Sequence, residues 1–319
     1  MAASSASTLL GSVPLPRTRL IGREVECAAA RTFLSEETVP LLTLIGPGGV
    51  GKTRLALAIA RDAASCFADG VVWIDLAPMA DPDLVSAAVA AALGIIATSH
   101  ESPADDIVRA LRVLQTLLLL DNCEHVLART ADLVASLLPH CPTVQVLATS
   151  RAPLHLHGEQ LLVVDPLPLP AETAALSVVE QNDAVRLFTE RARAVRPAFA
   201  VTETNAAAVA TLCRQMDGLP LAIELAAART SILAPRALLS QMSDRLHVLT
   251  HGMRDAPARQ QTMAATIAWS HDLLPAQKQA LFRRLAGFDG GFTLEAADAV
   301  CTDGGDASDP VFDVVAALV

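Results

Sequence analysis

The residues with the clearest chemical signature form one loop, Gly46-Pro47-Gly48-Gly49-Val50-Gly51-Lys52-Thr53. Their types and spacing fit the pattern G-x-x-x-x-G-K-[ST], in which backbone N–H groups surround phosphate oxygens, the lysine reaches the β and γ phosphates and the hydroxyl binds Mg²⁺. Lys52 is one of only two lysines in the chain, so chance is a poor explanation for a lysine at this position. The loop predicts a bound nucleoside triphosphate, ATP or ADP with Mg²⁺, and makes Thr53 a metal ligand.

A strand must lead into such a loop and a helix must follow it. The apolar run 41–45 is predicted to be a buried strand, and residues 54–60 a helix that begins near Lys52. The N-terminus of that helix favours negative charge, and Arg54 beside it joins the predicted nucleotide contacts. The four glycines of the loop are expected to adopt dihedral angles closed to other residues.

A second group of candidates follows another apolar run. Leu117-Leu118-Leu119-Leu120-Asp121 ends in a carboxylate, and the carboxyl ends of parallel strands open on one edge of a sheet. Asp121 is therefore predicted to hold Mg²⁺ together with Thr53. Hydrolysis also needs a base for the attacking water, and the next residue, Asn122, cannot serve as one. Glu124 and His125 could reach a water, but the favoured interpretation places both in the first turn of a solvated helix.

Arg151 follows the strand-like segment 144–150, which is predicted to lie beside the strand of the phosphate loop. A guanidinium at this edge can pair with a γ-phosphate and so distinguish a triphosphate from a diphosphate. In this setting a sensor role is favoured over that of an ordinary surface charge.

The organisation of the chain supports one nucleotide-binding domain followed by helices. Strand-like runs at 41–45, 71–76, 117–121, 144–150 and 161–164 alternate with helical patterns, which predicts a doubly wound parallel α/β sheet. Three prolines within 165–170 mark a boundary, and the pattern from about residue 182 is helical only. The expected divisions are a flexible segment 1–19, a nucleotide-binding domain 20–168, a helical domain 169–254 and a partial further domain 255–319.

Composition limits the function classes. The 319 residues carry a net charge of −10, which argues against broad attraction to nucleic acid or anionic lipid. The share of hydrophobic residues is 52%, but no apolar run approaches the ~18 residues that span a membrane. Six dispersed cysteines without a C-x-x-C pair suggest reduced thiols. These features predict a cytoplasmic protein without a membrane partner.

Six motifs in order resemble the STAND class of signalling ATPases, and most closely the NB-ARC-like module of bacterial LuxR-type and SARP (AfsR)-type transcriptional regulators. They are Leu20-Ile21-Gly22-Arg23-Glu24, the phosphate loop, Leu120-Asp121-Asn122-Cys123-Glu124-His125, Ala148-Thr149-Ser150-Arg151, Gly218-Leu219-Pro220-Leu221-Ala222 and Ala258-Arg259-Gln260-Gln261-Thr262. The resemblance implies a P-loop NTPase sheet, an α-helical lid domain and a partial winged helix. It also implies that Ile21, Gly22 and Arg23 lie along the adenine and that Pro220 packs on adenine or ribose.

The resemblance implies a nucleotide-operated switch that regulates transcription, with slow hydrolysis controlling conformation and self-association in the ATP state. DNA would be contacted only through a domain not present in this chain. Two departures matter: Asn122 replaces the second acid of the usual pair, and the chain stops before the second nucleotide contact of the winged helix. The alternatives are a turnover ATPase, metabolic or motor, and a stand-alone winged-helix DNA-binding protein.

Overall fold

The structure, a computed structural model, describes residues 13–35, 39–95, 102–172, 175–242, 249, 261–272, 274, 276–288 and 292–301. The chain divides into two compact units. The first comprises Met1–Leu187 and Val201–Pro220, and the second Phe188–Ala200 and Leu221–Val319.

A five-stranded parallel sheet forms the centre of the first unit. Its strands are β1 (Leu41–Ile45), β2 (Val71–Asp75), β3 (Leu117–Asp121), β4 (Gln145–Ser150) and β5 (Glu159–Val163). The order is β2-β3-β4-β1-β5, so β1, which leads into the phosphate loop, pairs with β4 on one side and β5 on the other. This order brings the carboxyl ends of β1, β3 and β4 to the same edge of the sheet.

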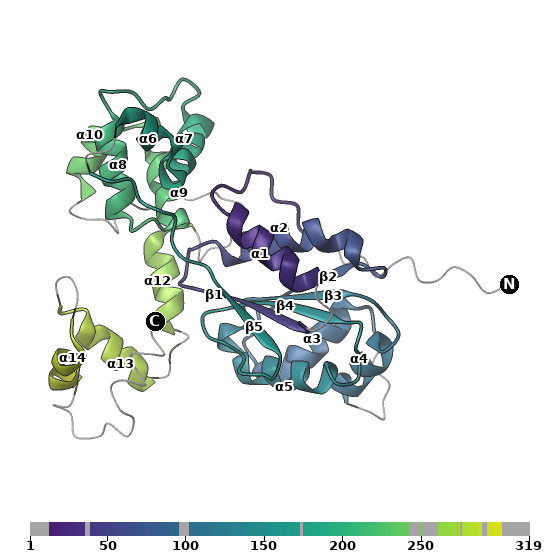
Figure 1. The fold of residues 1–319 in the computed structure, drawn as a ribbon. Coiled ribbons are helices and arrows are strands. Elements are labelled where there is room, and N and C mark those ends of the chain that lie inside the picture. Colours follow the sequence, from purple (N-terminus) through teal and green to yellow (C-terminus); the bar gives the residue numbers. More distant parts are fainter. Residues whose placement is uncertain are drawn as a thin grey trace. The chain divides into compact units, whose positions relative to one another are not determined.

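Alternating side chains of the strands supply two separate cores. In β3, Leu117 and Leu119 belong to the core beneath α1 (Glu24–Ser35) and α2 (Lys52–Ala63). Leu118 and Leu120 belong to the core beneath α3 (Val85–Ala92), α4 (Pro103–Leu111) and α5 (Leu127–Leu137). Figure 1 shows these two groups of helices on opposite faces of the sheet. Burial on both faces explains why β3 is an unbroken apolar run.

The remaining described helices follow the sheet or connect its parts. The first unit adds α6 (Leu176–Gln181), α8 (Ala206–Gln215) and the short 3₁₀ turns Ala64–Cys66, Pro82–Leu84 and Cys123–His125. α7 (Asp183–Val195) contributes to both units. The second unit contains α9 (Pro220–Ala228, beginning in the first), Arg229–Ser231, α10 (Pro235–Ser240), α12 (Met263–Asp272), α13 (Ala276–Leu285) and α14 (Leu294–Cys301).

The parallel α/β sheet predicted from the sequence is confirmed, with strand limits that differ by two residues at most. Helices α1, α4 and α6 lie outside the predicted set. The winged helix and the four domain limits stay predictions. The segment 251–260, which holds most of the last motif, lies outside the described residues.

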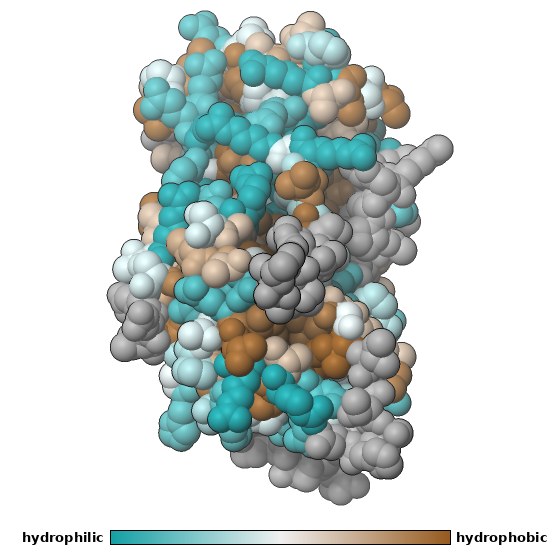
Figure 2. Space-filling model, turned by 90° about the vertical axis from the view of Figure 1, so that its right-hand side faces the viewer, coloured by the Kyte–Doolittle hydropathy of each residue, from teal (hydrophilic) through white to brown (hydrophobic). Residues whose placement is uncertain are grey.

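No helix in the described part of the chain is long and apolar enough to cross a membrane. Figure 2 shows one face of the molecule, on which teal hydrophilic side chains border several brown hydrophobic areas.

Candidate nucleotide site

The phosphate loop connects β1 to α2 and has the backbone shape that its glycines permit. Gly49 and Gly51 lie in the left-handed region, with φ of 80° and 98°. Gly46 is required for a different reason, because a Cβ there would lie 2.5 Å from the carbonyl oxygen of Val164. For Gly48 the prediction that all four loop glycines adopt dihedral angles closed to other residues is wrong. Its φ is not positive, so its backbone conformation is open to other residues.

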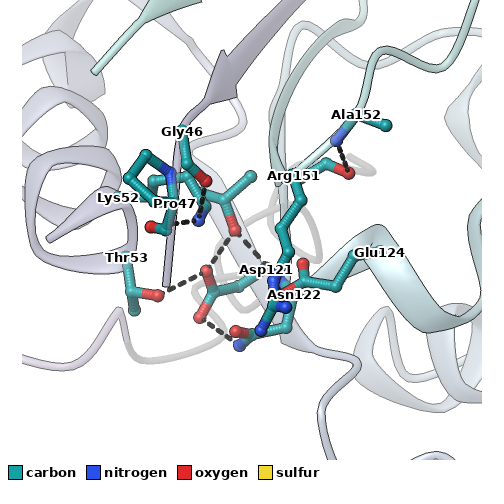
Figure 3. Close-up of polar contacts among 11 residues, drawn as sticks. Gly46, Pro47, Lys52, Thr53, Asp121, Asn122, Glu124, Arg151 and Ala152 are labelled. Carbon is teal, nitrogen blue, oxygen red and sulfur yellow. Dashed lines mark hydrogen bonds and ion pairs between the residues drawn. The ribbon is translucent and has the colours of Figure 1, made fainter. Parts of the chain in front are cut away.

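Lys52 is the first residue of α2, and its side chain lies across the loop. It is buried at 9% exposure, and its Nζ donates to the carbonyl oxygens of Gly46 at 2.7 Å and Pro47 at 3.1 Å (Figure 3). Burial lowers the pKa of Lys52, while Glu124 opposes that shift. The ammonium is thus surrounded by the loop in which a phosphate would be bound.

Asp121 lies at the carboxyl end of β3 and receives two hydroxyl hydrogen bonds. Its Oδ1 accepts from Thr53 Oγ1 at 2.9 Å and from Thr149 Oγ1 at 2.6 Å. Burial raises its pKa to about 6, against the effect of these hydroxyls and in the same direction as the charges of Asp75 and Glu124. The predicted metal ligands Thr53 and Asp121 are therefore brought together.

This raised pKa has a consequence for stability without nucleotide. Because the folded pKa lies above the unfolded one, the cost of ionising Asp121 is absent below the unfolded pKa of 3.8 and fully present above about pH 6. Between these values the wild type is expected to lose up to about 3 kcal/mol of unfolding free energy relative to Asp121→Asn. Urea titrations of both proteins at pH 4.5 and 7 capture about 2 kcal/mol of this difference, and parallel pH dependences would contradict it.

Asn122 separates two carboxylates that end neighbouring strands. It has a left-handed backbone with φ of 63°. Its Nδ2 donates to Asp121 Oδ2 at 2.9 Å and to Asp75 Oδ1 at 3.2 Å. Asp75 was missed by the sequence analysis, although Val71–Asp75 shows the same signal as β3, an apolar run that ends in an aspartate.

Glu124 and Arg151, predicted as base and sensor, contact each other. Arg151 Nε lies 3.4 Å from Glu124 Oε1, and the side chains are 26% and 10% exposed (Figure 3). Glu124 belongs to the 3₁₀ turn after β3, so it does not lie in the α-helix that follows. His125 shares this turn.

The segment predicted to contact adenine packs next to the loop. Ile21 and Arg23 are buried. The Arg23 guanidinium donates to the carbonyl oxygens of Val50 at 3.2 Å and Asp165 at 2.8 Å. At Gly22, with φ of 66°, a Cβ would lie 2.6 Å from the side chain of Asp183, a neighbour that sequence reasoning did not identify.

Two further predicted contacts, Arg54 and Pro220, lie in α2 and at the start of α9. The Arg54 guanidinium donates to the carbonyl oxygens of Thr18 at 2.8 Å and Arg19 at 3.1 Å. Pro220 begins α9, a position that tolerates a missing N–H. Leu219 before it packs against the core that contains Val50. The nucleotide contacts of Arg54 and Pro220 stay predictions.

The geometry of the loop and its neighbouring strands defines a class of protein. A glycine loop joins a central parallel strand to a helix, a buried lysine begins that helix, and a threonine beside it meets an aspartate from another strand. These are the features of a P-loop NTPase, a class that implies nucleotide binding.

Comparison with known proteins names the family. Residues 23–153 match the model of the NB-ARC domain. An uncharacterized protein of Mycobacterium tuberculosis, Rv0894, is 41% identical over 283 residues, which are 89% of this chain and 69% of that protein. The regulatory protein AfsR of Streptomyces coelicolor is 33% identical over 87% of this chain. This chain belongs to the same family as Rv0894, and its residues 23–153 form an NB-ARC domain.

Several relatives are much longer than the chain. The protein of Mycobacterium tuberculosis named "Putative HTH-type transcriptional regulator Rv0890c" is 44% identical over 82% of this chain, but the match spans 28% of its own length. The chain likewise spans 27% of AfsR.

A solved structure supports the fold. The ORC2 protein of Aeropyrum pernix, determined as complexes with ADPNP and ADP, superposes with a TM-score of 0.52 over 98% of this chain and 90% of its own, at 13% identity.

Proposed function

We propose that this chain is the nucleotide-operated switch of a bacterial transcriptional regulator, which binds ATP or ADP with Mg²⁺ and hydrolyses ATP slowly. The observation that carries the proposal is the meeting of Lys52, Thr53 and Asp121 at one edge of the sheet. The names of the longer relatives, AfsR and an HTH-type regulator, support a role in regulation.

The residues present fit a nucleotide bound with Mg²⁺. The cradle at Gly46 has no room for a side chain, and the Lys52 ammonium would pair with phosphate oxygens in place of the loop carbonyls. Thr53 and Asp121 offer oxygen donors. No group of three or more His, Cys, Asp and Glu side chains among the described residues could hold a metal alone. Mg²⁺ would therefore be shared with the phosphates, as this ion prefers.

The ion pair between Glu124 and Arg151 supports a switch rather than a turnover enzyme. The two side chains form an ion pair, so a γ-phosphate would compete with Glu124 for the guanidinium. Only then would the carboxylate be released toward a water. Asn122 supplies no other base at this position, so the second candidate, a turnover ATPase, is not favoured by the site.

Arg151→Ala is expected to weaken ATP binding by about tenfold more than ADP binding, because only ATP carries the group that Arg151 would contact. Calorimetry with both nucleotides measures the difference, and Arg129→Ala, which removes an arginine paired with Asp83 elsewhere in the fold, serves as the control. Equal losses for both nucleotides would assign Arg151 a structural role.

Steady-state hydrolysis by the chain alone is expected to remain below about 1 s⁻¹, the lower end of typical enzyme turnover. The reason is the ion pair of Glu124 with Arg151 and the amide of Asn122, which cannot act as a base. Phosphate release at saturating ATP gives this number, and faster turnover without a partner would favour the turnover ATPase.

The proposed switch is tested by comparing the protein bound to an ATP analogue with the protein bound to ADP. With Mg²⁺ and a non-hydrolysable ATP analogue, the wild type is expected to self-associate and to change its hydrogen-exchange pattern relative to the ADP form. Arg151→Ala should retain the ADP pattern with both nucleotides. Identical patterns and sedimentation for the wild type in both nucleotides would leave nucleotide binding in place but reject the switch.

A further inference from the structure

A cavity of about 650 Å³ lies among α1, α2 and the segment before α1. None of the loop residues 46–53 lines it, whereas Arg23 and Arg54, two of the predicted nucleotide contacts, do. Its lining contains six arginines and two acidic residues, namely Arg17, Arg19, Arg23, Arg31, Arg54, Arg61, Glu24 and Asp62. We call it the α1–α2 arginine cavity.

The two helices present one face each to this cavity. α1 contributes Glu24, Cys27, Ala28 and Arg31, at the spacing of three and four residues that shares a helix face. The residues of α2 that line it, Arg54, Ala58, Arg61 and Asp62, are spaced in the same way. They alternate with Leu55, Ile59 and Ala63, which are buried toward the sheet. The cavity therefore opens on the side of α2 that faces away from the strands.

The third wall is the segment Pro16–Leu20, and Arg54 anchors it. Its guanidinium donates to the carbonyl oxygens of Thr18 and Arg19. This contact holds the backbone of the segment against α2. The side chains of Arg17 and Arg19 remain exposed, and no ion pair of either is found among the described residues.

Positive charge at this cavity exceeds what its acids can neutralise. Arg31 lies 2.5 Å from Asp62, and Arg61 lies 3.8 Å from the same carboxylate. Arg23 is satisfied elsewhere, with Glu26 at 2.6 Å. With Arg23 paired to Glu26, the other five arginines against Glu24 and Asp62 leave a balance of +3, in a chain whose net charge is −10. Three of these arginines lie on α1 and α2 and two on the segment before α1, so an anion bound among them would be stabilised by several positive charges.

We propose that the α1–α2 arginine cavity binds a small ligand that carries several phosphate groups. The guanidinium fork matches phosphate oxygens in pairs, and one such ligand can neutralise several arginines at once. A volume of 650 Å³ lies within the range of small-molecule sites and accommodates a ligand of nucleotide size. Arg31 and Arg61 provide the binding charges at the helical walls, and Arg17 and Arg19 provide them at the third wall.

The experiment uses the full chain with Lys52→Ala, so that the phosphate loop does not capture the probe. Calorimetry measures the titration of inorganic triphosphate into this protein at 0.1 M salt. The added double substitution Arg31→Ala/Arg61→Ala is expected to weaken binding by at least about tenfold, the effect of losing one charged hydrogen bond or more.

The matched control is Arg109→Ala/Arg129→Ala in the same background. These arginines are also on helix surfaces and ion-paired, at 56% and 54% exposure against 59% and 57% for Arg31 and Arg61. The control removes the same net charge, so it should change triphosphate affinity by less than about twofold through long-range screening alone.

Asp62→Asn supplies a test in the opposite direction. It frees Arg31 and Arg61 from their shared carboxylate and should tighten triphosphate binding, which misfolding could not do. No binding to the Lys52→Ala protein, or equal losses in both double variants, would overturn the proposal. So would binding of a short DNA duplex, lost with Arg31 and Arg61, without any binding of triphosphate. Because Lys52 is absent throughout, none of these results bears on the phosphate loop.

Discussion

Lys52→Ala is expected to lower the affinity for both ATP and ADP by at least about 100-fold. The ammonium is the only lysine charge in the phosphate loop and would exchange the carbonyls of Gly46 and Pro47 for phosphate oxygens. A charge-assisted hydrogen bond contributes about 1.5–3 kcal/mol, and two such bonds to phosphate account for that loss. Calorimetry with each Mg²⁺-nucleotide measures it.

Two controls separate lost binding from lost folding. Lys278→Ala removes the other lysine, which lies in α13, and should leave both affinities unchanged. Burial lowers the pKa of Lys52, so the folded protein bears the cost of desolvating this charge. Lys52→Ala should therefore keep or raise the thermal midpoint without nucleotide. Unchanged ADP affinity in a folded Lys52→Ala protein would remove the basis of the proposed function.

Gly218→Ala is expected to destabilise the protein by at least about 4 kcal/mol, a loss that marks a specific structural conflict. Gly218 has φ of 70°, and a Cβ there would overlap the carbonyl oxygen of Leu167. Because the two backbone segments lie this close, the carbonyl oxygen of Gly218 also accepts a hydrogen bond from the N–H of Leu167 at 2.9 Å. A methyl group would thus strain the backbone and break this connection.

Gly94→Ala isolates the backbone part of that cost. Gly94 has nearly the same φ, 68°, but a Cβ there meets no atom within 4 Å. Its substitution should cost only about 1 kcal/mol, from the left-handed conformation alone. Denaturant unfolding of the two variants compares them directly, and similar losses would show that the approach to Leu167 is unimportant.

The sequence was sufficient for the parts of the site that depend on local pattern. The apolar run of β3 and its terminal Asp121 are contiguous, and the glycine spacing identifies the loop. The burial of β3 on both faces follows from the same logic, because a strand of four successive leucines has no polar face to expose. These features predicted the parallel sheet and the meeting of Thr53 with Asp121.

The parts that were missed depend on pairing across the fold. No local pattern indicates that Glu124 contacts Arg151, since 3.4 Å between them arises only when β3 and β4 align. The approach of Asp183 to Gly22 has the same origin, because α7 is distant in sequence from the loop region. Helix α4 was overlooked although Ser102 caps it, because its apolar face covers only two turns.

The amide of Asn122 has a consequence for protein engineering. It donates to Asp121 and Asp75 at once, so one amide serves two carboxylates at adjacent strand ends. Aspartate would suit the left-handed backbone at this position, yet it would replace a shared donor with a third acceptor. Rapid hydrolysis could therefore not be installed by Asn122→Asp alone. Neutralising Asp75 in the same variant would be the minimum additional change.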